Sequence, residues 1–340
     1  MTQYFIRRLL LVFPTFLGIT VLVFTITRFV PGGPIERMIA AMQQVGEGQS
    51  GGASDATGSS ALSADQMAQL EEYYGFDKPI LQSYFEWLWK VVNLDLGEST
   101  RFGDPVWDVI VDKLPVSTYF GLMTVLLTYL ICVPLGVFKA IKHASIFDSF
   151  SSIMVFMGYA VPGFVVGVLL LMVFSVQLEW FPLGGFVSTD FEDLEFAEKV
   201  WDLLKHTFLP LCAYMAGSFA TMTLLMKNSL MDNLAADYVR TAISKGLPFG
   251  KAVLRHAFKN SLIPLATHFG NNISLIITGS FLIEFVFNID GFGLLGFEAV
   301  VERDYPVVMG ILVISSVLQL TGNILSDVCV ALVDPRVQFK

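Results

Sequence analysis

Long apolar runs alternate with polar stretches along the whole chain, and each run is long enough to cross a bilayer. An α-helix of roughly 20 apolar residues crosses the hydrocarbon core, because each residue adds about 1.5 Å. The pattern therefore predicts an all-α membrane protein with six transmembrane helices. The predicted spans are the helix within residues 1–30, then 115–138, 150–176, 206–226, 261–287 and 307–333.

The charges of the connecting segments predict the orientation of these spans. Arg7 and Arg8 precede the first span, which continues without a cleavage site and is expected to be retained. Segments 139–149, 227–260 and 334–340, with the first residues, carry 12 Lys/Arg against 4 Asp/Glu, whereas segments 31–114, 177–205 and 288–306 carry 8 against 24. Because Lys and Arg stay on the inner side, both termini are expected in the cytoplasm.

The polar segment 227–260 is too patterned for a simple connection. Its sequence predicts one short helix through 236–245 and a second helix after a break. Gly246 stands where a helix commonly ends on a residue with positive φ, and Pro248 suits the start of the next helix. A surface loop that only sets topology would need the charges but not this break. We therefore expect a docking module.

The second predicted helix of this segment is amphipathic. Apolar and basic residues fall on separate faces at helical spacing. The apolar face comprises Val253, Leu254, Ala257 and Phe258, and the basic stripe comprises Lys251, Arg255 and Lys259.

The fifth predicted span, 261–287, is unusually polar. Its polar residues include His268, Asn271, Asn272, Ser274 and Glu284. Polar groups at membrane depth face a bundle interior or a wet cavity, so this span is expected to line a translocation path. Two alternatives remain open: the asparagines hydrogen-bond a neighbouring helix, or Glu284 is hydrated near the outer interface.

Three further segments have a recognisable character. Residues 43–65 are rich in Gly, Ser and Ala, which predicts a disordered tether. The aromatic run Tyr84, Phe85, Trp87, Leu88 and Trp89 is expected at the membrane interface. In span 150–176, Gly163 and Gly167 permit close helix packing and Pro162 predicts a kink.

Composition excludes several classes of function. Mean hydropathy of +0.64 with 15% charged residues excludes a soluble domain, and no basic groove suits nucleic acid. Gly246 to Lys251 is one residue short of a phosphate-binding loop. Gly291, Gly293 and Gly296 spell GxGxxG, but no strand precedes them. The three cysteines form no disulfide or zinc pattern, and we expect no catalytic residues and no metal site.

DYVRTAISKGLPFGKAVLRHAFKNSLIP resembles the EAA loop of permeases from ATP-binding-cassette (ABC) importers, in the oligopeptide/dipeptide form. YFIRRLLLVFPTFLGITVLVFTITRFVPGGP, GFDKPI, TGSFLIE, GFGLLG, ERDYPV and DPR resemble the same family, so the likeness covers nearly the whole chain. The triplet of the motif reads RTA here, which departs from EAA. The resemblance implies a permease subunit in a bacterial inner membrane, with the outer segments in the periplasm.

The resemblance also implies roles for individual residues. The residues expected to couple to an ATPase are Arg240, Thr241, Ala242, Lys245, Gly246 and Leu247. Those expected in the path are Asn271, Asn272, Ser274 and Glu284. Those expected to face a binding protein are Gly291, Phe292, Gly293, Arg303, Asp304 and Tyr305, in a hairpin whose glycines would allow a tight turn.

The implied partners are a second homologous permease, one or two ABC ATPase subunits, a periplasmic solute-binding protein, a peptide substrate and membrane lipid. ATP and Mg²⁺ would bind the ATPase, so the chain is expected to hold no cofactor and to be no enzyme. Two alternatives remain: a permease of this family for nickel chelates or sugars, and a secondary transporter. The latter would need paired intramembrane acids or inverted repeats.

Overall fold

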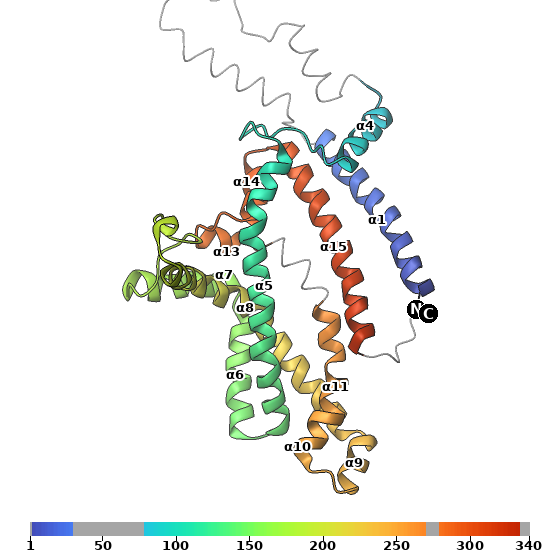
Figure 1. Cartoon of the computed structure of the whole chain (residues 1–340), viewed down its shortest axis with the longest axis vertical. Helices are drawn as coiled ribbons and strands as arrows, with labels where there is room; N and C mark the ends of the chain where they lie inside the picture. Colours follow the sequence, from blue (N-terminus) through green and yellow to red (C-terminus); the bar gives the residue numbers. More distant parts are fainter. Residues whose placement is uncertain (1, 30–77, 270–278, 334–340) are drawn as a thin grey trace, which may run out of the picture. The chain divides into compact units, whose positions relative to one another are not determined.

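The computed structural model describes residues 2–29, 78–269 and 279–333, and the regular elements within these ranges are helices (Figure 1). The predicted insert 43–65 and tail 334–340 lie outside this part. The helices are α1 (Thr2–Phe29), α4 (Ile80–Val92), α5 (Val106–Ile141), α6 (Ile146–Ala160), α7 (Gly163–Leu170), α8 (Phe196–Ala235), α9 (Asp237–Ser244), α10 (Phe249–Ala252), α11 (Phe258–Ser261), α13 (Phe281–Val286), α14 (Phe292–Val301) and α15 (Tyr305–Val333). Leu171–Gln177 and Val253–Ala257 are π-helical, and Phe191–Asp193 is a 3₁₀ turn.

Within the described ranges, four helices are long and apolar enough to cross a membrane: Ile6–Ile26, Val106–Ile141, Phe196–Ala235 and Tyr305–Leu332. A broken pair, Ile146–Ala160 with Gly163–Gln177, adds a fifth candidate, bent by 99°. The predicted span 261–287 includes residues 270–278, which lie outside the described part. The number six therefore stays a prediction.

The chain divides into two compact units. One unit contains residues Met1–Val12, Lys113–Leu295 and Val317–Lys340, and the other contains Phe13–Asp112 and Gly296–Ser316. Helices α1, α5, α14 and α15 contribute residues to both.

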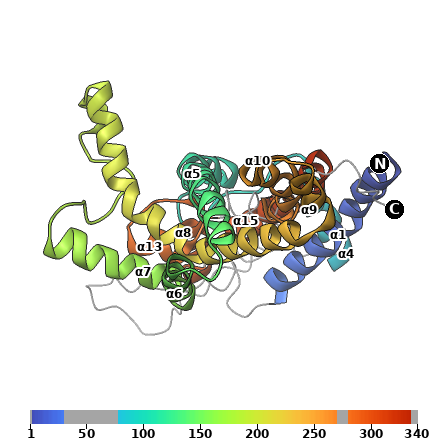
Figure 2. The same cartoon turned by 90° about the horizontal axis from the view of Figure 1, so that it is seen from below.

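In the first unit, the predicted kink at Pro162 is a complete break between α6 and α7. Pro162 is the N-cap of α7 with ψ 140°, so the chain turns there, and Figure 2 shows the two helices running in different directions. A Cβ atom on Gly163 would lie 2.7 Å from the carbonyl oxygen of Ala213, and one on Gly167 would lie 3.0 Å from the ring of Phe287. The small residues thus allow the close packing that the sequence predicted.

Helix α8 is much longer than the predicted span 206–226. A capping box between Glu195 and Glu198 starts it at Phe196, inside the predicted outer segment. It continues to Ala235, so the first residues of the predicted polar segment belong to this helix. The helix tolerates Pro210 and Gly217 within it, and its sequence from Ser218 to Ala235 contains neither glycine nor proline.

In the second unit, two contacts organise the helices. The hydroxyl groups of Thr20 on α1 and Tyr84 on α4 lie 2.9 Å apart and are buried. Gly310 on α15 allows close packing against the start of α5, because a Cβ there would lie 2.8 Å from Val106 and 3.1 Å from Ile110.

Candidate docking module, cavity and buried carboxylate

Helix α9 ends as the sequence predicts, on a glycine with positive φ. Gly246 has φ +90°, its N–H donates to the carbonyl of Ile243 at 2.9 Å, and the Leu247 N–H donates to Ala242 at 3.1 Å. This pair of bonds is the Schellman motif, which satisfies the last carbonyl groups of a helix. Leu247 then packs against the core cluster beneath.

Helix α9 is fixed to the rest of the unit by few but well-placed contacts. Val239 is fully buried, and it packs in a cluster with Met226, Leu230 and Ala257. The Tyr238 hydroxyl donates to Asn233 on α8 at 2.5 Å and accepts from Asn260 at 3.0 Å.

The outward face of α9 and its C-cap residue contain four of the residues predicted to couple to an ATPase. Arg240, Thr241 and Lys245 are exposed, and Ala242 is half-buried. Ile243 is also 39% exposed, although it is apolar. A short helix that buries one residue and presents a mixed apolar and basic face is suited to receive a partner.

The second helix of the module differs from the predicted amphipathic helix. Residues 249–261 are helical, but Val253–Ala257 form a π-helical turn, which has more residues per turn than an α-helix. Val253 and Ala257 are buried as predicted, whereas Leu254 is 65% exposed. The wider turn rotates Leu254 away from the expected apolar face. The predicted basic stripe of Lys251, Arg255 and Lys259 is exposed.

Below the module, three charged residues form a buried cluster that the sequence did not reveal. Asp148 on α6 accepts from Lys227 on α8 at 2.7 and 2.8 Å, and Lys139 on α5 lies 3.1 Å from the same carboxylate. Lys139 is fully buried and also donates to the hydroxyls of Ser151 and Ser152. The cluster joins α5, α6 and α8. Both lysines directly follow predicted apolar spans, so the sequence alone indicated only that they help to set the orientation of the spans.

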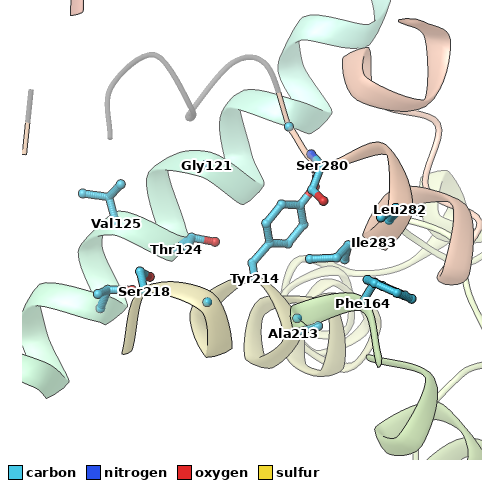
Figure 3. A pocket seen from close by; sticks show the side chains of 14 residues that line it. Gly121, Thr124, Val125, Phe164, Ala213, Tyr214, Ser218, Ser280, Leu282 and Ile283 are labelled. Atoms are coloured by element: carbon cyan, nitrogen blue, oxygen red, sulfur yellow. Dashed lines mark hydrogen bonds between the residues drawn. The ribbon is translucent and has the colours of Figure 1, made fainter. Parts of the chain in front are cut away.

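A cavity of about 410 Å³ lies farther along the same helices (Figure 3). Its described lining comes from α5, α7, α8, α13 and the segment just before α13, and it consists of glycines, hydroxyl groups, aliphatic side chains and the ring of Phe164. The lining residues are Gly121, Thr124, Val125, Thr128, Gly163, Phe164, Ala213, Tyr214, Gly217, Ser218, Gly279, Ser280, Leu282 and Ile283. Of these, Tyr214 extends from α8 across to Ser280. This described part of the wall carries no formal charge.

Glu284 lies behind this wall and is 1% exposed. Its carboxylate accepts from the Tyr214 hydroxyl at 3.0 Å and from the Leu294 N–H at 2.7 Å. The alternative in which Glu284 is hydrated near the outer interface is therefore wrong. Glu284 itself does not line the cavity; it holds Tyr214, which does. The other predicted path residues, Asn271, Asn272 and Ser274, lie outside the described residues, while His268 is half-buried.

The glycines around Glu284 allow the backbone to lie close to its carboxylate. A Cβ on Gly291 would lie 2.6 Å from Glu284 Oε2 and 2.9 Å from Ser117 Oγ, and a Cβ on Gly279 would collide with Glu284 Oε1. Ser117 accepts from the Phe292 N–H at 2.7 Å, so side chains from α5 and α13 bind the first N–H groups of α14. The expected glycine turn is instead a helix start, and Gly291 fits there because it has no side chain.

Most residues predicted to face a binding protein are buried. Gly291 and Phe292 are buried in the first unit, and Gly293 is half-buried. In the second unit Asp304 and Tyr305 are buried and Arg303, with φ +57°, is exposed. A contact by the buried residues would require the loops to open, so these residues are better explained by packing; their predicted role stays untested.

Asp304 binds the loop before α5. Its carboxylate accepts from the Ser99 hydroxyl at 2.5 Å and from the N–H groups of Thr100 and Arg101, each at 3.2 Å. Arg101 pairs with Glu298 and Glu302 on the surface, and hydrogen bonding to Glu298 raises the pKa of the Arg101 guanidinium. Asp304 and Ser99 are far apart in the chain, so no local pattern could have paired them.

Comparison with known proteins identifies the family to which these features belong. Residues 132–339 match the family described as binding-protein-dependent transport system inner membrane component. The chain belongs to this family. It is therefore a multi-pass inner-membrane protein, as its apolar helices indicate.

Relatives in this family align along the whole chain. The chain is 39% identical over 360 residues to the "Peptidoglycan transport system permease protein YejB" of Agrobacterium fabrum, covering 100% of this chain and 99% of that protein. It is also 39% identical to the "Inner membrane ABC transporter permease protein YejB" of Escherichia coli O157:H7, over 362 residues and 100% of both. The "Oligopeptide transport system permease protein AppB" of Bacillus subtilis is 34% identical over 340 residues, again covering 100% of both chains. These matches confirm the resemblance to peptide permeases, including those of the YejB type.

Proposed function

We propose that the chain is the membrane-spanning permease subunit of an ABC importer that moves peptides across the inner membrane by alternating access. Family membership and the names of full-length relatives support the class of transporter and of cargo. The observation in the structure that best supports the proposal is the docking module, in which α9 is exposed on one face and packs Val239 into the core cluster on the other.

The geometry suggests how movement of the docking module reaches the cavity. Helix α8 carries Asn233, which binds Tyr238 of α9, and it also carries Tyr214 and Ser218 of the cavity wall. Asn233 and Ser218 are about 22 Å apart along one continuous helix. A displacement of α9 by a partner would thus move the cavity wall as one rigid element, which is the type of bistable change that alternating access needs.

The partners follow from this mechanism. An ABC ATPase binds ATP and Mg²⁺, closes, and displaces α9 through Arg240, Thr241, Ala242 and Lys245. A second homologous permease completes the path, and a periplasmic solute-binding protein delivers the peptide to the outer loops. The chain itself then needs no cofactor and catalyses no reaction, because the free energy enters as differential affinity between two states of the complex.

The described wall of the cavity suits a substrate that is recognised by general features. Hydroxyl groups and glycines can approach a peptide main chain, whereas no charged residue of the described lining selects a particular side chain. Selectivity would then rest mainly with the binding protein. The same wall would also accept a neutral sugar, so cargo class needs a direct test.

The experiment is purification of the tagged chain in mild detergent, followed by identification of all co-purifying chains. We expect an ABC ATPase and one homologous permease. The assembled complex, in proteoliposomes with its binding protein, should take up labelled peptides only when ATP is supplied. Recovery of the chain alone, or uptake driven by an ion gradient, would support a secondary transporter. ATP-driven uptake of a nickel chelate or sugar in place of peptides would contradict the peptide assignment.

A further inference from the structure

The carboxylate of Glu284 connects the cavity wall to the start of α14 by an unbroken chain of hydrogen bonds. The Ser280 N–H donates to the Tyr214 hydroxyl at 3.1 Å, and that hydroxyl donates to Glu284 Oε1 at 3.0 Å. The other oxygen, Oε2, accepts from the Leu294 N–H at 2.7 Å. Each bond in such a chain polarises the next, which strengthens the set as a whole.

The surroundings of Glu284 permit little alternative placement. Gly279 and Gly291 leave no room for a Cβ beside the carboxylate, and Ser117 holds the neighbouring Phe292 N–H at 2.7 Å. A buried carboxylate with donors on both oxygens is stable, but the same carboxylate without them carries a desolvation penalty. The segment from Ser280 to Leu294 therefore has one preferred position against Tyr214.

We infer that Glu284 is a positioning residue that latches the hairpin 280–294 to Tyr214, so that the hairpin and the cavity wall move together. The inference rests on the proposed function, in which this hairpin lies on the outer side. A binding protein that displaces the hairpin then opens the cavity through Tyr214. As long as the hairpin is not displaced, the hydrogen bonds of Glu284 hold the outer side of the cavity closed.

The test uses a thiol reporter in the cavity of the assembled complex. A Cβ at Gly217 has no atom within 4 Å, so Gly217→Cys adds a thiol to the wall without a clash. The background lacks Cys132, Cys212 and Cys329. Intact cells are treated with a membrane-impermeant maleimide, and the labelling rate of the reporter is measured. This rate reports access from the outside, and loss of a purely structural contact would not selectively raise it.

Glu284→Gln removes the charge at nearly constant volume, and Tyr214→Phe deletes one hydroxyl. We expect each variant to raise the labelling rate by about tenfold or more, because that is the worth of a hydrogen bond to a charged group. Gly291→Ala should have a similar effect, and its effect should not add to that of Glu284→Gln, since both release the same carboxylate.

Asp290→Asn is the matched control. Asp290 is in the same hairpin, is largely exposed and pairs with Lys113 at 2.5 Å, so its variant should label like the parent. Rates of Glu284→Gln and Tyr214→Phe equal to the control would overturn the latch. If Glu284→Gln does not assemble, an unchanged rate in Tyr214→Phe is sufficient to overturn it. Labelling needs no transport, and ATP-dependent uptake by the unmodified complex tests the proposed function separately.

Discussion

At the scale of single residues, the groups with the greatest consequence are buried and charged. Asp148 is 4% exposed and compensates two lysines that come from different helices. A buried charge that loses its partner costs more than the intact pair contributes, because the remaining charge has no water to solvate it. The cluster of Asp148, Lys139 and Lys227 therefore matters mainly because each buried charge is neutralised, and less because the ion pairs themselves add stability.

We expect Asp148→Asn to destabilise the protein by about 3 kcal/mol, since it leaves two buried lysines without a carboxylate. Thermal unfolding of the purified protein in detergent measures the effect. Asp232→Asn, an exposed acid on α8, is the control and should unfold like the parent. Equal unfolding temperatures for the two variants would show that the buried cluster does not stabilise the fold.

Gly246 offers a second test at this scale, because its φ of +90° is unfavourable for any residue with a Cβ. Gly246→Val should cost about 2 kcal/mol or more locally and abolish uptake while the protein still inserts into the membrane. Gly250→Val is the matched control: a Cβ there also meets open space, and its backbone needs no positive φ. Uptake and membrane abundance are compared. Full uptake by the Gly246 variant would refute the coupling role of this cap.

The two glycine sites also show what the sequence could reveal about residues. The role of Gly246 follows from its neighbours in the chain, because a helix end is a local structure. The groups around the Glu284 carboxylate cannot be inferred in this way, because Tyr214 and Ser117 are far from it in sequence. The tertiary partners of a polar residue are set by packing, which no local pattern specifies.

At the scale of elements, α4 has three distinct faces. Tyr84 and Val91 are buried, and Tyr84 packs on Thr20 and Phe24 of α1. Gln82 and Glu86 form a polar stripe, and hydrogen bonding from Lys78 lowers the pKa of Glu86. The third face is apolar and exposed, and its residues are Leu81, Phe85, Trp89 and Val92. Of the aromatic run predicted at the membrane interface, Tyr84 thus packs against α1, whereas Phe85 and Trp89 lie on this exposed face.

The contact with Thr20 sets the depth of α4. Thr20 lies within the apolar helix Ile6–Ile26, and Arg28 donates to the carbonyl of Lys78. We expect this face to lie in lipid, so spin labels at Phe85 and Trp89 should be accessible to oxygen but not to a water-soluble nickel complex. A label at Glu86 is the control and should be accessible to the nickel complex. Access of nickel to all three sites would exclude insertion, and low access to both reagents at Phe85 would indicate a protein partner.

Element boundaries were predicted less well than element types. Spans of helix were expected from hydropathy, but α8 extends beyond the predicted span at both ends because helical propensity continues into polar sequence. The break at Pro162 was expected, whereas its angle of 99° depends on the contact of α7 with α8. The π-helical turn at Val253–Ala257 had no sequence signal, and it accounts for the wrong placement of Leu254.

At the scale of the whole molecule, one ion pair bears on the topology. Arg8 near the start of α1 lies 2.8 Å from Asp327 near the end of α15, and both belong to the first unit. Because two residues in contact at the ends of two spans lie at the same depth, we expect both termini to be on one side of the membrane.

On this expectation the number of membrane crossings is even, and the excess of Lys and Arg predicts that the termini lie in the cytoplasm. Green fluorescent protein, which does not fluoresce after export in unfolded form, should fluoresce when fused to either end. Alkaline phosphatase, which is active only outside, should be active when inserted within 43–65 and inactive at either end. Fluorescence at one terminus with phosphatase activity at the other would require an odd number of crossings. The pair Arg8–Asp327 and the prediction of six spans would then both be wrong, because neither is compatible with termini on opposite sides.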